Sequence, residues 1–533
     1  MKKLTIVLLL ILFLAPYAFG REEVGGKFYT REELKKSPEI FEKEKDEQKA
    51  RPDFFPGRTP LLSHIWKDKT KSWDGKTEYY ATDEDRDRRP QRLILPMDPE
   101  GNRLWVTKEK YWKWPTTREI VPPDVYKEIA PPYGASKLSE EWHKLIGLQA
   151  TELTGKIAPE IKPGLIITQG DLKNYPGLKE LLPPSVHMLF DRGYFFSLPQ
   201  MEIVPTRDLY LGYNWLKFSG ENLKNCKVDT ATKKLTGWRA ATPFPRPKTG
   251  LELIWNIDKH DIVGDNLRFA PMYWDLYGRD GKYERTYHFN LWYYRQSGRA
   301  HISPMPQVGE NKEGLFEWMI NYFSYPQDIA GMTLFRARYD DPDKPDLCMA
   351  YVPSMRRVRK ISGTDVFDPL LGGDMIWEDF RSMWQKISPT VFPMEYKILE
   401  KREYLMPSST AYGYGRHYPK LGKIYWCWER RPVYVVEVRA LDPTYIYSKR
   451  ILYIDMETFY LYYIENYDRK GKLWRTWLKN HVNEPDTGLQ YEDITLIMDH
   501  MNKHVTVLHF TPSLGMKWIT QGLINKFFSE RGR

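Results

Sequence analysis

Cysteine is scarce in this sequence, which excludes a scaffold built on disulfide bonds. The chain has three cysteines, Cys226, Cys348 and Cys427, and their spacing matches no zinc-ligand pattern. An exported protein can hold disulfides, but three cysteines allow three different single pairs and always leave one thiol over. One bridge and no bridge are therefore both open.

Signature motifs of common enzyme classes are missing as well. The chain contains no HExxH, G-x-S-x-G, Walker A or G-x-G-x-x-G sequence, so no motif argues for a metalloprotease, an esterase or a nucleotide-binding enzyme. The neighbours Glu378 and Asp379 do not by themselves indicate a glycosidase, because its two carboxyl groups need a defined separation in space. We predict no enzymatic activity, no catalytic residues, no cofactor and no metal.

The sequence also lacks a strong charge of one sign and, after its first residues, any long apolar run. Its formal net charge is +10, from 80 basic and 70 acidic side chains, and the two signs alternate closely. The mean hydropathy is −0.60. This composition predicts no nucleic-acid partner and no membrane span in the mature chain.

The N-terminus carries the one long apolar run. A pair of lysines precedes an apolar segment over 4–17, and Ala18 and Gly20 place small residues where signal peptidase reads the chain. The run is about 14 residues, shorter than the roughly 20 that cross a bilayer as a helix. No cysteine follows it to accept a lipid. We predict a signal peptide over 1–20, cleaved after Gly20, and a soluble periplasmic protein exported across the inner membrane.

Composition divides the rest of the chain into four parts. Residues 21–60 are polar and predict an extended or disordered lead-in. Residues 61–164 read as a Pro-rich, irregular extension, 165–515 as a β-rich domain, and 516–533 as a C-terminal tail with a short helix. Aromatic residues make up 15% of the chain, which favours sheet because such side chains fit a pleated, half-buried surface.

The strand signal is strongest in the C-terminal half. Two apolar segments, 445–454 and 459–467, flank a polar turn and predict a hairpin. Further strands are expected at 283–294, 332–339, 347–352, 473–477, 494–498 and 505–510. Consecutive strands joined by short turns predict an antiparallel meander.

A few helices are expected beside this sheet. Ser139 is a candidate N-cap for a helix whose apolar face carries Trp142 and Ile146. Leu251, Ile254 and Trp255 have helical spacing over 250–257. Two more helices are predicted, one from the apolar stripe Leu315, Phe316, Met319 and Ile320, and a short one over 380–387. A large antiparallel sheet with a few amphipathic helices is an α+β arrangement.

A basic cluster stands between two of the expected strands. If residues 356–360 are extended, alternation places Arg357 and Arg359 on one face. An edge strand protected by charge explains such a cluster. A contact with lipid headgroups or a partner protein is the functional alternative, and we name both arginines as candidates for it.

Several segments in the right order resemble a known family. The segment from Lys449 to Trp474, a strand, an Asp-centred turn, a strand and a YD-x-x-G-K turn, is similar to a hairpin of the outer-membrane lipoprotein-sorting (LolA/LolB-like) superfamily. Further segments resemble one Gram-negative family of uncharacterised periplasmic proteins assigned to that superfamily: 167–176, 242–256, 328–332 and 351–360. The resemblance covers roughly residues 165–515.

The resemblance implies a large curved antiparallel sheet, an unclosed barrel with helices covering its concave face, that holds a hydrophobic ligand. An acyl chain gains about 0.8 kcal/mol per CH₂ removed from water, so such a carrier needs an apolar cavity. The predicted function is a periplasmic carrier or accessory protein in envelope transport, with a lipid or hydrophobic small molecule as ligand and an inner-membrane export pump or an outer-membrane protein as partner. The predicted lining is Trp255, Phe316, Leu452, Ile454, Phe459 and Leu461.

Two other functions are compatible with the same residues. An aromatic cleft with two converging carboxylates would indicate a glycan-binding or glycan-hydrolysing enzyme. An aromatic surface facing another protein would indicate a structural subunit of an envelope complex.

Overall fold

The computed structural model describes a body that runs, with gaps, from residue 123 to residue 514. The described residues are 21–24, 27–30, 123–191, 194–198, 200–260, 264–361, 367–379, 387–408, 416–418, 423–484, 487–510, 512–514 and 522. The predicted signal peptide, nearly all of the predicted helix over 380–387 and nearly all of the C-terminal tail lie outside them. Of the predicted lead-in, only a small hairpin of β1 (Arg21–Val24) and β2 (Lys27–Thr30) is described.

Strands make up most of this body. Their bounds are β3 (Ile166–Thr168), β4 (Gln200–Val204), β5 (Lys227–Val228), β6 (Leu235–Thr236), β7 (Asn266–Tyr277), β8 (Tyr283–Arg295), β9 (Leu315–Tyr325), β10 (Thr333–Tyr339), β11 (Leu347–Val352), β12 (Arg357–Ile361), β13 (Met394–Ser408), β14 (Arg416–Tyr418), β15 (Lys423–Tyr425), β16 (Cys427–Ala440), β17 (Lys449–Asp455), β18 (Leu461–Tyr467), β19 (Leu473–Asn483), β20 (Gln490–Asp499), β21 (His504–His509) and β22 (Pro512–Leu514).

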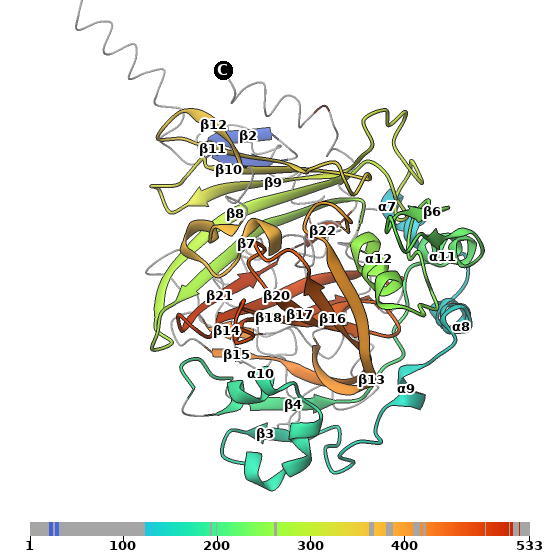
Figure 1. The fold of residues 1–533 in the computed structure, drawn as a ribbon, viewed down its shortest axis with the longest axis vertical. Coiled ribbons are helices and arrows are strands. Elements are labelled where there is room, and N and C mark those ends of the chain that lie inside the picture. The colour runs from blue at the N-terminus through green and yellow to red at the C-terminus, as the bar shows by residue number, and fades with distance from the viewer. Residues whose placement is uncertain are drawn as a thin grey trace, which may run out of the picture.

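Sixteen of these strands form one curved sheet (Figure 1). Its main path runs β12-β11-β10-β9-β8-β7-β21-β20-β19-β18-β17-β16-β4-β3, with β13 paired to β16 and β22 paired to β7. The pairs are antiparallel except β4 with β16 and a single bridge between β13 and β19. Within the described residues β12 and β3 end this path, so the sheet stays open. The predicted α+β class, a large antiparallel sheet forming an unclosed barrel, is confirmed.

Short helices accompany the sheet. The α-helices are α7 (Pro123–Ile129), α8 (Ala135–Ile146), α9 (Ala150–Leu153), α10 (Pro184–His187), α11 (Tyr213–Asn225) and α12 (Gly250–His260). The 3-10 helices are η5 (Leu172–Asn174), η6 (Pro176–Glu180), η7 (Met188–Phe190), η9 (Leu370–Gly372) and η10 (Trp377–Asp379). Figure 1 shows α8 and α11 together at one flank of the sheet and α12 beside β13. No helix among the described residues is long and apolar enough to cross a membrane.

Local chemistry explains the elements that the sequence predicted well. Thr249 and Glu252 form a capping box at the start of α12, since each side chain binds the backbone N–H of the other. Gly250 follows, and a Cβ there would lie 2.7 Å from the backbone of Tyr396, so α12 can approach β13 closely only with glycine at this position. In the turn from β18 to β19, the Asp468 carboxylate accepts backbone N–H groups and Gly471 has a φ of 79°. The predicted helix at 250–257 and the predicted β17–β18 hairpin are confirmed.

Two helix predictions are wrong. The stripe of Leu315, Phe316, Met319 and Ile320 lies in strand β9, not in a helix. Side chains on both faces of β9 are buried, because the two faces pack against different core clusters. The apolar residues of this strand therefore do not alternate with polar ones. Ser139 is not an N-cap, because α8 begins four residues earlier, after Gly134.

Alternation along β17 feeds two of the core clusters, on opposite faces of the sheet. In β17, Leu452 and Ile454 join the larger core, which also takes in residues of α8, α11 and α12. Ile451 and Tyr453 point to the opposite face and join the second core, under η6 and α10. All three cysteines are free thiols.

Candidate functional site

Five of the six predicted lining residues belong to the same buried core. Trp255, Leu452, Ile454, Phe459 and Leu461 all belong to the larger core and are at most 3% exposed. The sequence could not say which strand face points to the helices, and the structure supplies that choice. Their role in binding a ligand stays a prediction.

Phe316, the sixth predicted residue, lies near this group but contacts a charged side chain. It is fully buried, its ring centroid is 4.1 Å from Lys259 Nζ, and it also contacts the ring of Trp238. Lys259 in turn lies 3.6 Å from the Asp340 carboxylate. Phe316 therefore packs against a buried cation.

Arg357 and Arg359 lie on β12, the last strand at this end of the sheet among the residues that the structure describes. Both are exposed, as is Val358 between them. The expected edge strand carrying exposed basic side chains is therefore present. Whether the two arginines contact headgroups or a partner stays a prediction.

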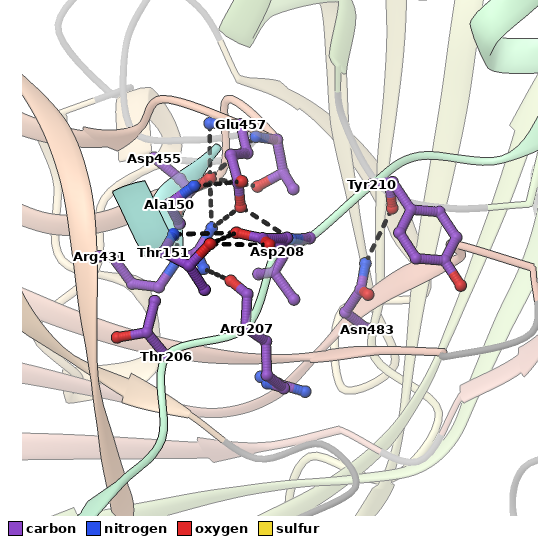
Figure 2. Close-up of polar contacts among 12 residues, drawn as sticks. Ala150, Thr151, Thr206, Arg207, Asp208, Tyr210, Arg431, Asp455, Glu457 and Asn483 are labelled. Atoms are coloured by element: carbon purple, nitrogen blue, oxygen red, sulfur yellow. Dashed lines mark hydrogen bonds and ion pairs between the residues drawn. The ribbon is translucent and has the colours of Figure 1, made fainter. Parts of the chain in front are cut away.

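A buried polar network joins the N-terminal helices to the turn between β17 and β18 (Figure 2). The fully buried Glu457 carboxylate accepts the backbone N–H groups of Ala150 and Leu209, each at 2.7 Å. His143 Nε2 lies 3.0 Å from the same carboxylate. Burial lowers the pKa of His143, but the hydrogen bond and the charge of Glu457 outweigh this and raise it. The Glu457 side chain thus binds α8, α9 and the residues just before α11.

The same network contains a series of buried ion pairs around Arg431. Arg431 Nε lies 2.8 Å from the Asp455 carboxylate, and its Nη2 lies 2.5 Å from Glu457. Its third partner is Glu429, at 3.3 Å, which also binds Arg207 at 2.7 Å. Asp455 further accepts the N–H groups of residues 457 and 458. Each charged side chain of this network has a partner of opposite charge, as a buried ion network requires. We therefore interpret the network as a structural joint.

α8, which this joint holds through His143, lies beside α11, and a groove lies between the two helices. The groove has a volume of about 560 Å³ and is lined by Tyr133, Glu141, Lys144, Leu145, Tyr213, Leu216, Lys217, Gly220, Leu223 and Arg246. Its apolar walls, Tyr133, Leu145, Tyr213 and Leu216, pack against the larger core, the one that holds Trp255 and Leu452. The volume is within the range of about 300–1,000 Å³ usual for a small-molecule site.

The rim of the groove is mostly basic. Lys144, Lys217 and Arg246 are exposed there. Arg246 donates from Nε to the Leu145 carbonyl and from Nη2 to the Lys144 carbonyl, both at 2.8 Å, at the C-terminal end of α8. This end carries the negative pole of the helix dipole, which favours a cation. The groove therefore combines an apolar interior with a positively charged mouth.

A second group of ionisable side chains lies inside the larger core, around η10. Arg450 reaches Asp379 at 3.5 Å and donates to Asn466 at 2.9 Å, and the Tyr445 hydroxyl donates to Glu378 at 3.4 Å. Burial raises the pKa of Glu378 to about 7, against the opposing effect of Arg450. Burial raises the pKa of Asp379 as well. Of the glycosidase pair considered from sequence, Asp379 is thus buried and engaged with an arginine, and Glu378 is half-buried beside it.

A further pocket of about 590 Å³ lies over η6 and α10, lined by Leu172, Leu182, Met188, Phe190 and polar neighbours. It packs on the second core, away from the predicted lining residues. Among the described residues no group of three or more His, Cys, Asp and Glu side chains is arranged to hold a metal ion.

Sequence reasoning missed the groove, although one of its walls was visible. The helix around Trp142 was predicted, but α11 was not, and Arg246 lies 101 residues after the carbonyl that it binds. The available signal was the spacing of Tyr213, Leu216 and Gly220 on one helical face.

Comparison with known proteins gives a family and several partial likenesses. The model of a family described as "Protein of unknown function (DUF1329)" matches residues 166–531. An uncharacterized protein of Pseudomonas aeruginosa is 25% identical over 267 residues, covering 48% of this chain and 56% of the relative. The chain thus spans little more than half the length of the curated relative it matches.

Two solved structures show a similar arrangement over half of the chain. A DUF1329 family protein of Desulfovibrio piger is 16% identical, with a TM-score of 0.35, and the match covers 49% of this chain and 90% of that one. A LolA superfamily protein of Nitrosomonas europaea is 14% identical, with a TM-score of 0.31, covering 50% and 94%.

Proposed function

Since the chain belongs to the DUF1329 family of proteins of unknown function, as its resemblance to an uncharacterised family predicted, we propose that it is a periplasmic carrier or accessory protein for a lipid or other hydrophobic ligand. One observation carries the proposal. The walls of the groove between α8 and α11 pack against the same apolar cluster that contains the predicted lining residues. A hydrophobic molecule in the groove would extend an existing core instead of meeting water.

The physical basis is the hydrophobic effect. Removing apolar surface from water contributes about 25 cal/mol per Å², and the groove offers leucine and tyrosine side chains on both walls. The predicted lining residues deeper in the core are already packed. We therefore place the ligand in the groove and not among the packed side chains of the core.

Leu216→Asp should weaken the binding of a neutral lipophilic probe. Leu216 is half-buried in the groove wall, and an aspartate there removes apolar contact and places a carboxylate against the ligand. We expect at least a tenfold loss of affinity, about 1.4 kcal/mol, in a fluorescence titration with N-phenyl-1-naphthylamine. Met501→Asp is the matched control, because Met501 is 45% exposed in a turn and does not line the groove.

Lipid co-purified with the mature protein, identified by mass spectrometry, would give the ligand directly. A protein that is always recovered empty and binds no lipophilic probe would overturn the proposal. Equal affinities of the wild type, Leu216→Asp and Met501→Asp would show that the probe binds elsewhere.

The basic edge strand supplies a proposed contact with an anionic membrane surface or an envelope partner. Arg357 and Arg359 are exposed on β12, and a basic residue near an anionic bilayer contributes about 1 kcal/mol. Arg357→Gln together with Arg359→Gln should therefore reduce co-sedimentation with phosphatidylglycerol vesicles by about tenfold or more. The control replaces Lys470 and Lys472, two exposed lysines of the β18–β19 turn, and unchanged binding is expected.

The glycan-hydrolase alternative has one observation in its favour. Burial raises the pKa of Glu378 to about 7, so about half of these carboxyl groups hold a proton at neutral pH, and a general acid needs the protonated form. This alternative requires that Glu378→Gln abolish release of sugar from a periplasmic glycan. The carrier proposal predicts no such activity in either protein.

A further inference from the structure

We infer that the ligand of the groove between α8 and α11 is a single-chain anionic amphiphile, with its hydrocarbon tail between the two helices and its charged head at the basic rim. The inference rests on the proposed function and makes it more specific. Charge, free space and volume each support it.

The charge of the rim favours an anionic head. Within the described part of the chain, neither Lys144 nor Lys217 has a carboxylate within 4 Å, and Lys217 Nζ instead lies 5.2 Å from the ring centroid of Tyr213. Glu141, the one acidic residue of the lining, is occupied by the Tyr133 hydroxyl and by Lys137 at 4.0 Å. The lining therefore has three basic side chains and a single carboxylate, and that carboxylate already has partners.

Arg246 makes this charge a fixed feature of the groove. Its two hydrogen bonds to the end of α8 hold the guanidinium in place, whereas the lysines are free to turn towards a ligand. A guanidinium that still has unused N–H groups is suited to carboxylate and other oxyanions.

Gly220 provides space for the tail. It lies inside α11 and lines the groove, and a Cβ built on it meets no atom within 4 Å. Glycine inside a helix is unfavourable relative to alanine, and neither a positive φ nor close packing requires it here. Its lack of a side chain keeps the floor of the groove open between Leu216 and Leu223.

The volume is sufficient for one hydrocarbon chain. About 560 Å³ is the size of a site for one small ligand. Leu223, which is 45% exposed at the end of the groove, would be covered by such a tail.

The test compares heads on a constant tail. Dodecanoate, dodecyltrimethylammonium and the uncharged dodecyl maltoside, each below its micellar concentration, compete with N-phenyl-1-naphthylamine bound to the full-length mature protein. We expect dodecanoate to displace the probe at a concentration about tenfold lower than either of the others, with the difference shrinking as salt is added. Equal displacement by all three overturns the inference and leaves the proposed function standing, whereas no displacement by any of them overturns both.

Variants locate the effect in the groove. Lys144→Glu with Lys217→Glu should remove the preference for dodecanoate and leave probe binding intact, while Lys224→Glu, on an exposed position of α11 outside the lining, should change neither. Gly220→Trp should block the probe and dodecanoate alike. Gly220→Ala, which meets no neighbour, should retain binding and shows that the helix tolerates a side chain. A preference that survives the double lysine variant overturns the inference, because the head then binds elsewhere.

Discussion

Glu457→Ala is expected to destabilise the protein by about 3–5 kcal/mol, the usual cost of breaking one partner out of a buried ion pair. The substitution leaves Arg431 with one carboxylate fewer and removes the acceptor of the Ala150 and Leu209 N–H groups. Because Glu457 binds residues in and after α8 and α9, the substitution should mainly weaken the packing of these helices against the β17–β18 turn. Urea unfolding followed by tryptophan fluorescence measures the change, and limited proteolysis should cut first between residues 123 and 209.

The control for this variant is Glu140→Ala, on the exposed face of α8. It removes a carboxylate from the same helix without touching the network, so its stability should stay within about 0.5 kcal/mol of the wild type. A Glu457→Ala protein as stable and as resistant to protease as this control would mean that the network does not hold the segment. The groove should also lose its ligand in Glu457→Ala, since α8 forms one of its walls.

Glu378→Gln is expected to change how stability depends on pH. Burial raises the pKa of Glu378 from 4.5 to about 7 in the folded protein, so between these two values the folded state binds more protons than the unfolded state. Stability therefore falls as pH rises through this window, and at pH 8 the ionised Glu378 lowers stability by up to about 3 kcal/mol. Glutamine carries no charge, so the variant should equal the wild type below pH 4.5 and be the more stable protein above pH 7.

The measurement is a series of urea unfolding curves from pH 4 to pH 8. Glu437→Gln is a control with the opposite sign. Although partial burial raises the pKa of Glu437, hydrogen bonds and charge from Arg439 and Lys449 lower it overall, so its contribution is present above pH 4.5 and is lost as the pH falls. Parallel stability curves for the wild type and Glu378→Gln would contradict the assignment of a raised pKa to this carboxyl group.

Much of the sheet could be predicted because its turns are local. Asp468 and Gly471 form a turn with atoms that lie within five residues of each other, and Thr249 and Glu252 start α12 in the same way. The turn before Tyr460 was expected too, but Phe459 adopts a φ of 58° there, a left-handed conformation that is rare for an aromatic residue. Its ring is buried in the larger core, and its N–H binds the Asp455 carbonyl, so tertiary packing imposes that conformation.

The two wrong helix predictions have separate physical causes. Phe316 was assigned to a helix because apolar residues on both faces of β9 satisfy helical spacing by coincidence, and only the neighbouring strands show which spacing applies. Ser139 has the chemistry of a cap, but the helix begins earlier, and its hydroxyl lies 3.3 Å from His143 Nδ1 instead.

The sequence by itself determined the family, the antiparallel sheet and the apolar residues of its core, because strand period, turn chemistry and resemblance are all written in short segments. Only the tertiary structure decided which face of the sheet those residues share, that Glu457 joins three distant parts of the chain, and that α8, α11 and Arg246 enclose a groove. These features depend on residues up to about three hundred positions apart, and sequence spacing carries no information about the distance between them once the chain has folded.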